Sequence, residues 1–196
     1  PRLLAGMSEE SSAHAEQFLR EMGVNILLNK RVVDYRDHKV VLEDGTEIAT
    51  RTFIWVSGVT GVTIGNLDAS LIGRGGRIKV DSFNRVEGMN NVFAIGDQCI
   101  QLADENYPNG HPQLAQVAIQ QGELLAKNLV RMEKGREMKP FHYRNLGSMA
   151  TVGRNRAVAE FSKVKMQGWF AWVMWLVVHL RSILGGRNKV IVLLYW

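Results

Sequence analysis

The fold of this chain is constrained most strongly by a short apolar run. The run stops at Gly96-Asp97 and is followed by a long helical pattern. Residues 92–95 read Val-Phe-Ala-Ile, which is typical of a buried strand in a parallel sheet. In open α/β sheets, ligands bind outside the carboxyl ends of the strands. Asp97 would lie at such an end, where its carboxylate suits the hydroxyl groups of a ribose or ribityl chain. The predicted fold class is therefore α/β.

The helical pattern covers residues 113–129, with Pro112 in the first turn and only Gly122 as a breaker. One face is apolar, and polar residues recur on another at three- and four-residue spacing. The apolar stripe is Leu114, Val117, Ala118, Leu125 and Leu129, and the polar face is Gln113, Gln116, Gln120, Glu123 and Lys127. Free N–H groups in the first turn favour an electron-rich ligand edge, such as a reduced flavin ring. Ordinary α/β packing, with Asp97 as a cap, explains the pattern equally well.

Upstream, the pattern predicts a helix followed by several short strands. Ser8 caps the helix, Glu9 and Glu10 occupy its first turn, and Gly23 ends it. Its predicted buried face is Ala15, Phe18, Leu19 and Met22. Predicted strands cover residues 24–28, 32–35, 39–42, 46–49 and 53–56, with an Asp44-Gly45 hairpin turn between the third and the fourth. Downstream, residues 77–80 predict another strand, and residues 141–161 predict two strands around Gly147 and the turn 153–156.

Three strings, VFAIGD, AQVAIQQG and GSMATVGRNRAV, resemble the C-terminal half of a type II NADH:quinone oxidoreductase. This family comprises single-subunit, non-proton-pumping respiratory NADH dehydrogenases with two Rossmann-like domains for FAD and NADH. The resemblance implies that Gly96 and Asp97 meet the ribityl-phosphate region of FAD. It also implies that backbone amides of Ala115, Gln116 and Val117 face the isoalloxazine ring, and that Gln116 and Gln120 border the quinone.

The resemblance divides the chain into three parts. Residues 1–56 would end the NADH-binding domain, residues 57–165 would end the FAD-binding domain, and residues 166–196 would form a truncated membrane-associating segment. Ser57, Gly58 and Val59 would touch the nicotinamide, although a strand end that needs a glycine turn explains them equally well. No G-x-G-x-x-G with a strand before and a helix after occurs. We therefore expect both pyrophosphate loops upstream of Pro1, and an inactive fragment when residues 1–196 stand alone.

The C-terminal segment is basic and aromatic. Of the chain's net charge of +5, residues 131–196 contribute a surplus, with 12 Lys/Arg against 3 Glu. The apolar residues 169–178, with Trp169, Trp172 and Trp175, are too few to span about 30 Å of hydrocarbon. Basic residues flank them: Lys163, Lys165, Arg181, Arg187 and Lys189. The pattern favours a helix in the headgroup layer of an anionic membrane and excludes nucleic acid as the partner, while a buried core helix is the alternative. Trp175 would then form a wall of the quinone tunnel.

The predicted function is hydride transfer from NADH to FAD, followed by transfer of two electrons to a membrane quinone. The single cysteine, Cys99, excludes a redox-active cysteine pair, and the five histidines lack metal-ligand spacing. No side chain stands out as a catalytic acid or base. The predicted location is peripheral, on the cytoplasmic face of the inner membrane, and the sequence leaves a homodimer open. The alternatives are a ferredoxin-reductase-like flavoprotein and a non-catalytic, monotopic membrane-binding fragment.

Overall fold

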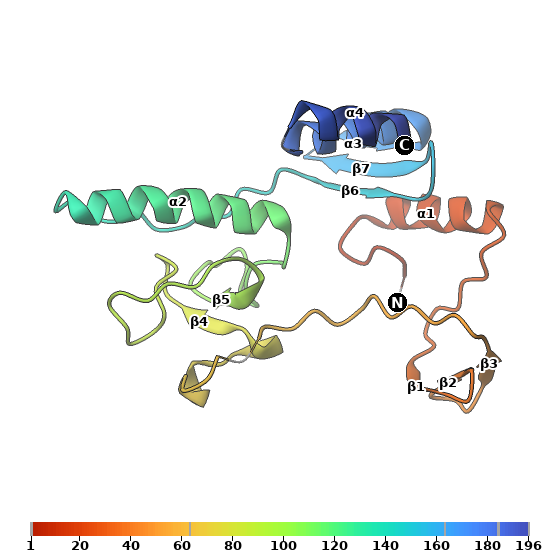
Figure 1. Cartoon of the computed structure of the whole chain (residues 1–196), viewed down its shortest axis with the longest axis horizontal. Coiled ribbons are helices and arrows are strands. Elements are labelled where there is room, and N and C mark those ends of the chain that lie inside the picture. Colours follow the sequence, from red (N-terminus) through yellow and green to blue (C-terminus); the bar gives the residue numbers. More distant parts are fainter. Residues whose placement is uncertain (1, 63, 163, 184, 196) are drawn as a thin grey trace. The chain divides into compact units, whose positions relative to one another are not determined.

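The chain forms two compact units, residues 1–55 with 146–196 and residues 56–145. The computed structural model describes residues 2–62, 64–162, 164–183 and 185–195, and Figure 1 labels their helices and strands. Lys163, one of the predicted basic flanks, lies outside the described residues, as do Pro1 and Trp196. The first unit combines segments from both ends of the chain, since residues 146–196 pack with residues 1–55.

Helix α1 (Glu9–Glu21) confirms the predicted first helix. Ser8 caps it, with its Oγ accepting from the backbone N of Ser11 at 3.3 Å, and Gly23 follows in the left-handed region at φ 80°. The buried residues of the helix are Ser11, Ser12 and Ala15. Met22 is exposed, so its predicted place on the buried face is wrong. Met22 is the C-cap and has left the helical path, so it no longer follows the stripe.

A three-stranded antiparallel meander follows, built from β1 (Val32–Arg36), β2 (Lys39–Leu42) and β3 (Glu47–Ala49). Gly45 has φ 82° in the turn between β2 and β3, which confirms the hairpin. The strands predicted at residues 24–28 and 53–56 are wrong, because no strand of the described chain pairs with either segment. An apolar run alone does not make a strand, since each strand needs a neighbour for its backbone groups.

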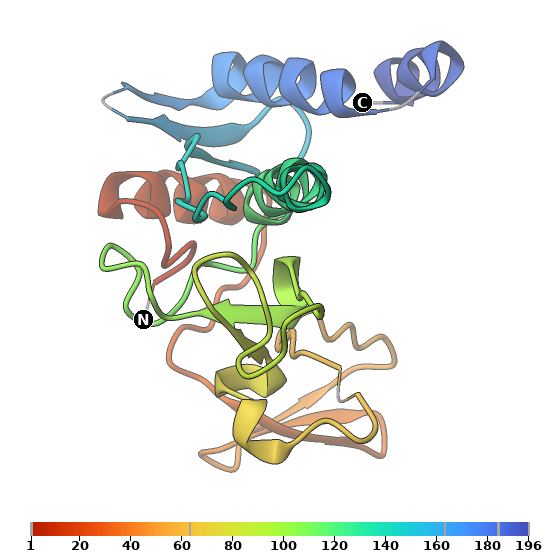
Figure 2. The ribbon, with the colours of Figure 1, turned by 90° about the vertical axis from the view of Figure 1, so that its left-hand side faces the viewer.

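The second sheet of this unit is antiparallel in the order β6-β7-β8. Its strands are β6 (Ser148–Thr151), β7 (Ala157–Phe161) and β8 (Val164–Gln167), so both predicted strands are confirmed and β8 is an addition. Helix α3 (Gly168–Ser182) and helix α1 contact this sheet from opposite faces (Figures 1 and 2). Ala157, Ala159, Ala171, Trp172 and Leu176 form the core under α3. A last helix, α4 (Gly186–Tyr195), contacts α3.

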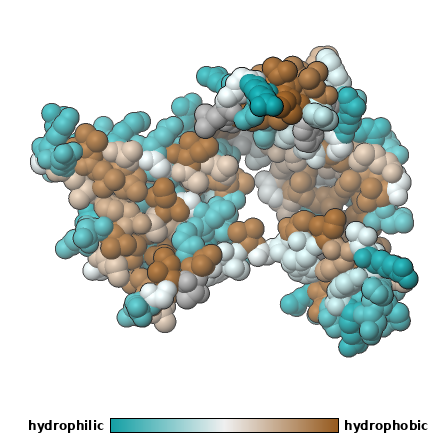
Figure 3. Space-filling view, in the orientation of Figure 1, coloured by the Kyte–Doolittle hydropathy of each residue, from teal (hydrophilic) through white to brown (hydrophobic). Residues whose placement is uncertain are grey.

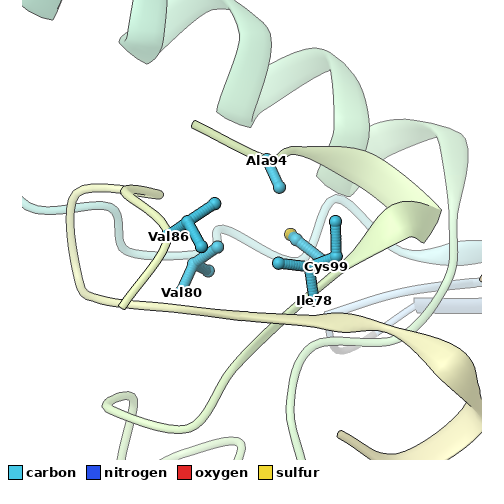
Figure 4. Packing of buried hydrophobic residues seen from close by; sticks show 5 residues of the cluster. All are labelled: Ile78, Val80, Val86, Ala94 and Cys99. Carbon is cyan, nitrogen blue, oxygen red and sulfur yellow. The ribbon is translucent and has the colours of Figure 1, made fainter. Parts of the chain in front are cut away.

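The second unit has a small parallel pair, β4 (Ile78–Val80) with β5 (Cys99–Gln101). Side chains of Ile78, Val80, Val86, Ala94 and Cys99 point toward one another in its core (Figure 4). Three single-turn helices accompany the pair: η1 (Ala69–Leu71), η2 (Arg74–Gly76) and η3 (Gly96–Gln98). The strand predicted at residues 92–95 is wrong, because its backbone makes only one isolated bridge, between Phe93 and Arg85.

Helix α2 (Ala115–Glu133) is the long helix of this unit. It begins two residues later than predicted, since Leu114 is its N-cap and Pro112 precedes the cap. Leu114 and Leu129, two members of the predicted apolar stripe, are exposed. Gln121 and Asn128 are buried instead, with Val117. The side facing the unit is therefore partly polar, and its amides make hydrogen bonds that replace those to water.

Candidate functional site

Gly96 and Asp97 lie in η3, directly against the first turns of α2. The backbone N of Gly96 donates to Oε1 of the buried Gln121 at 2.7 Å. Gly96 has φ 65°, and a Cβ added there would come within 3.1 Å of the Ala118 Cβ. Both facts require glycine, because larger residues avoid this φ and lack the space. The exposed Asp97 accepts from Gln113 through its backbone O at 3.2 Å, which leaves its carboxylate at the surface.

The N-terminus of α2 has no side-chain cap among the described residues. Leu114 is extended, at φ −133° and ψ 143°, and its carbonyl accepts from the N–H groups of Val117 and Ala118. The first N–H groups of a helix carry partial positive charge, and anions and electron-rich groups bind there. η3 contacts α2, through Gly96 with Ala118 and Gln121. Ala115, Gln116 and Val117 form the first turn of the same helix.

Ser57, Gly58 and Val59 are exposed and belong to no helix or strand. Three residues further along, Val62 N donates to Gln98 Oε1 at 2.9 Å, and Gln98 Nε2 donates to Val62 O at 2.6 Å. Gln98 belongs to η3, next to Asp97. The predicted nicotinamide contacts are thus on a segment whose end is hydrogen-bonded to the glycine-aspartate turn.

Gln120 makes a two-way contact with the backbone. Its Nε2 donates to Arg144 O at 2.9 Å, and its Oε1 accepts from Arg144 N at 3.0 Å. Asn128, two turns later, makes the same pair of bonds with Lys139, at 2.8 and 2.9 Å. Residues 139–144 are therefore fixed along α2 by side-chain amides. Between α2 and residues 140–142 lies a groove of about 280 Å³, and Gln120 is one of its lining residues.

A buried His–Asp pair, absent from the sequence-based prediction, lies in the loop before α2. His111 and Asp104 are 3% and 6% exposed, and His111 Nε2 lies 2.9 Å from Asp104 Oδ2. The hydrogen bond from His111 holds the pKa of the Asp104 carboxyl below its ordinary value. The ring of His111 packs against Tyr107, Phe141 and Tyr143. Histidine and aspartate are common residues, so the sequence contains no signal for this pair, and only the structure shows that they are in contact.

Two further predicted features have structural explanations. Cys99 is buried, and burial raises the pKa of its thiol, as expected for an inert core cysteine. Trp175 lies on α3 in the first unit, where its ring stacks on His179 with centroids 3.9 Å apart. Among the described residues, no group of three or more His, Cys, Asp or Glu side chains is arranged to hold a metal ion.

Two family models cover most of the chain. One, described as pyridine nucleotide-disulphide oxidoreductase, matches residues 1–122, and one for the NDH2 C-terminal domain matches residues 145–196. The chain belongs to the pyridine nucleotide-disulphide oxidoreductases. The resemblance to type II NADH:quinone oxidoreductases is confirmed as well, and with it the fold class.

Relatives in this family match almost the whole chain. Type II NADH:quinone oxidoreductase NdhA of Mycobacterium tuberculosis is 35% identical over 100% of the chain and 43% of its own length. The mitochondrial internal alternative NAD(P)H-ubiquinone oxidoreductase A1 of Arabidopsis thaliana is 32% identical over 99% of the chain and 41% of its own length. NDH2 of Plasmodium falciparum, solved in complex with NADH, has the same fold, with a TM-score of 0.82 at 18% identity, covering 96% of this chain and 54% of that one. The chain therefore spans about two fifths of the curated relatives' length.

Proposed function

We propose that the complete protein carrying this chain is a respiratory NADH:quinone oxidoreductase that does not pump protons. The observation that supports this most is the turn Gly96-Asp97 against the uncapped N-terminus of α2, in a chain of this family. FAD, when bound, accepts a hydride from NADH and passes two electrons to a membrane quinone. The protein supplies binding, orientation and electrostatics.

The residues at the turn fit the flavin part of FAD. Gly96 lets the backbone come close, and the exposed carboxylate of Asp97 accepts hydrogen bonds from flavin hydroxyls. Ala115, Gln116 and Val117 form the first turn of α2, whose positive end favours the electron-rich edge of the ring. Ser57, Gly58 and Val59 would contact the nicotinamide of NADH.

Gln116 and Gln120 would border the quinone, and the role of Trp175 in its tunnel stays a prediction from the resemblance. The two glutamines are one turn apart on α2. In Gln120 both amide atoms already bond to Arg144, so a quinone would share that amide, whose oxygen and nitrogen each have capacity for a second hydrogen bond.

The first test is Asp97→Ala in the complete protein, with Asp68→Ala as the control. Asp68 is a surface aspartate that caps η1 through Ser70 N at 2.8 Å. Loss of a charged acceptor costs about 1.5–3 kcal/mol, so we expect Asp97→Ala to lose FAD on purification while the control keeps it. The measurement is the ratio of flavin absorbance to protein. Stoichiometric flavin in Asp97→Ala would contradict the assignment.

The second test separates the two half-reactions. Gln116→Ala should raise the KM for quinone and leave the reduction of the flavin by NADH unchanged, because the two substrates use different sites. Stopped-flow reduction by NADH and steady-state turnover with quinone measure the two effects. Slowed reduction by NADH would place Gln116 on the other side of the flavin.

We also propose that α3 and α4 bind the cytoplasmic face of the inner membrane. Trp172 is 8% exposed and belongs to the core, but Trp169 is 54% exposed. Other large apolar side chains of the two helices are exposed as well: Phe170, Val177, Val178, Val190, Ile191, Leu193 and Leu194. Apolar side chains gather over these helices at the top of Figure 3. Among the described residues, no helix is both long enough and apolar enough to cross a bilayer.

Arg181, Arg187 and Lys189 lie on the same two helices, where they would face lipid headgroups. Binding should therefore depend on lipid charge and on salt, with each basic residue contributing about 1 kcal/mol on an anionic surface. Co-sedimentation with anionic and zwitterionic vesicles, at low and high salt, measures this for the complete protein and for one ending after Lys165. Equal pelleting of the two proteins would show that α3 and α4 are not the attachment site.

A further inference from the structure

The loop of residues 102–114 joins the two halves of the candidate site. It leaves β5, which follows Gly96-Asp97, and it ends at Leu114, the N-cap of α2. Within the loop, Asn106 N donates to Asp104 Oδ1 at 3.0 Å, and Tyr107 N donates to Asp104 O at 2.9 Å. At its end, Gln113 Nε2 donates back to Asp97 O. The loop is therefore a second connection between Asp97 and the start of α2, beside the bond from Gly96 N to Gln121.

His111 holds the loop through three groups. Its Nε2 bonds to the buried Asp104 carboxylate, and its backbone O accepts from Arg77 Nη2 at 3.1 Å. Arg77 also donates to Cys99 O at 2.7 Å, through Nε, so one guanidinium links β5 to the loop. The imidazole ring lies 5.1 Å from the ring of Tyr107 and 5.8 Å from that of Tyr143, between centroids. Residue 111 is two positions from Gln113 and four from the start of α2.

Burying the polar groups of this cluster lowers the stability of the fold. The depressed pKa of Asp104 indicates a carboxylate, so Nε2 of His111 carries the proton that is shared with it. The Nδ1 atom of His111 is buried without a hydrogen-bond partner among the described residues, as is the hydroxyl of Tyr143. Each unsatisfied buried group disfavours folding, and apolar residues often replace a buried charged pair without loss of stability. Stability alone does not explain why the pair is there.

We propose that Asp104 and His111 are positioning residues that fix the first turn of α2 against Asp97 and thereby set the reduction potential of the flavin. This inference rests on the proposed function. The positive end of a helix stabilises negative charge only within about one turn, so a small displacement of α2 changes the energy of the electron-rich form of the ring. The pair acts through Gln113 and the N-terminus of α2.

The test uses four variants of the complete protein: His111→Phe, Asp104→Asn, His111→Gln and the double variant Asp104→Leu/His111→Phe. His111→Phe keeps the ring packing and removes the hydrogen bond, while His111→Gln keeps a donor nitrogen that reaches Asp104. The double variant removes both polar groups and so leaves no buried carboxylate without a partner. Flavin content, thermal stability and the midpoint potential of the bound flavin are measured for each.

We expect His111→Phe and the double variant to shift the midpoint potential to more negative values while FAD stays stoichiometric. Asp104→Asn should show a smaller shift, and His111→Gln should stay closest to the wild type. Amide exchange of residues 102–114 should accelerate in the same order. A wild-type potential in the double variant, with normal flavin content, would overturn the inference and leave the pair a structural contact. Absence of flavin from the wild-type complete protein would instead contradict the proposed function.

Discussion

Helices α1 and α2 are attached to their units by different chemistry. Charged side chains anchor α1: Glu160 accepts from Ser8 N at 2.9 Å and from Ser11 Oγ at 2.6 Å, as well as from the hydroxyl of Ser8. At the other end, Arg156 bonds to Glu21 at 2.9 Å and to Phe18 O at 3.3 Å. Neutral amides anchor α2, through Gln121, Gln120 and Asn128, and each of them bonds to backbone.

The two kinds of attachment differ in how strongly they depend on salt and pH, and this difference bears on the proposed function. Partly exposed charges are screened by salt and lost on protonation, whereas amide-to-backbone bonds depend on neither. Amides hold α2 without adding charge at the site where the flavin is proposed to bind. The local field can then come mainly from the helix terminus and from Asp97. The four changes below test this comparison, from the largest expected effect to the smallest.

Gln121→Ala should have the largest effect. The Gln121 side chain is 1% exposed and accepts from Gly96 N, so its loss leaves a partly buried N–H without its acceptor. We expect η3 to open more easily by about 2 kcal/mol, which accelerates amide exchange at Gly96 about thirtyfold. Mass-spectrometric exchange on peptides that contain residue 96 measures this. The control, Glu123→Ala, changes an exposed side chain of the same helix and should change exchange much less.

Varying the salt concentration tests whether neutral contacts hold this end of α2. Exchange at Gly96 should be the same at low and high salt, both in the wild type and in Gln121→Ala. A strong salt dependence would contradict the view that neutral contacts hold this end of α2.

Glu160→Gln should have the next largest effect, of about 1–2 kcal/mol on the protection of α1, because a carboxylate accepts hydrogen bonds more strongly than an amide. Burial raises the pKa of Glu160, but hydrogen bonds from Ser11 and Ser8 and the charge of Lys165 outweigh it, so the pKa is lowered overall. A group with a lowered pKa stabilises the fold above its unfolded pKa of about 4.3 and loses this contribution as the pH falls through the folded value.

The expected result is that acid weakens the protection of α1 in the wild type and much less in Glu160→Gln. Amide exchange of residues 9–21, corrected for the intrinsic rate, measures this between about pH 6 and about pH 3. Equal acid sensitivity of the two proteins would mean that another carboxylate controls α1.

Gln120→Ala removes two partly exposed hydrogen bonds to Arg144. The free energy needed to detach residues 139–145 from α2 should fall by about 1 kcal/mol, so their amide exchange should accelerate about fivefold. Glu123→Ala, an exposed change one turn away on the same helix, is the control. The effect should persist in high salt. If exchange stays unchanged while the KM for quinone rises, the amide serves the quinone and its contact with Arg144 is incidental.

Local signals in the sequence predicted the local structure. Ser8 with Glu9 and Glu10 placed the start of α1, and Asp44-Gly45 placed the hairpin, because caps and turns depend on neighbouring residues. Gly96-Asp97 was predicted as the end of a buried strand, and the structure has the single-turn helix η3 there instead. The roles of these residues in cofactor binding stay predictions.

Contacts between segments that are distant in the sequence could not be predicted from any one segment. Apolar residues 53–56 and 92–95 suggested strands, but a strand depends on a partner elsewhere in the chain. No role for Gln121 was predicted from the sequence, because its partner Gly96 lies in η3, which is a separate segment. Glu160 bonds to Ser8, which is 152 positions away in the sequence. The pair of Asp104 and His111 escaped notice because neither residue has a distinctive sequence context.

Lys165→Ala should have the smallest effect. Its Nζ lies 3.0 Å from Glu10 Oε2, but the two side chains are 47% and 59% exposed, and such pairs contribute about 0–0.5 kcal/mol. Ordering two long side chains costs entropy that offsets the attraction, and salt screens what remains. We expect less than about a twofold change in the exchange of α1 at low salt and none at high salt. A double-mutant cycle with Glu10→Ala measures the coupling of the pair directly. If that coupling exceeded the effect of Glu160→Gln, the anchoring of α1 would depend on surface ion pairs, and the buried hydrogen bonds to Glu160 would be secondary.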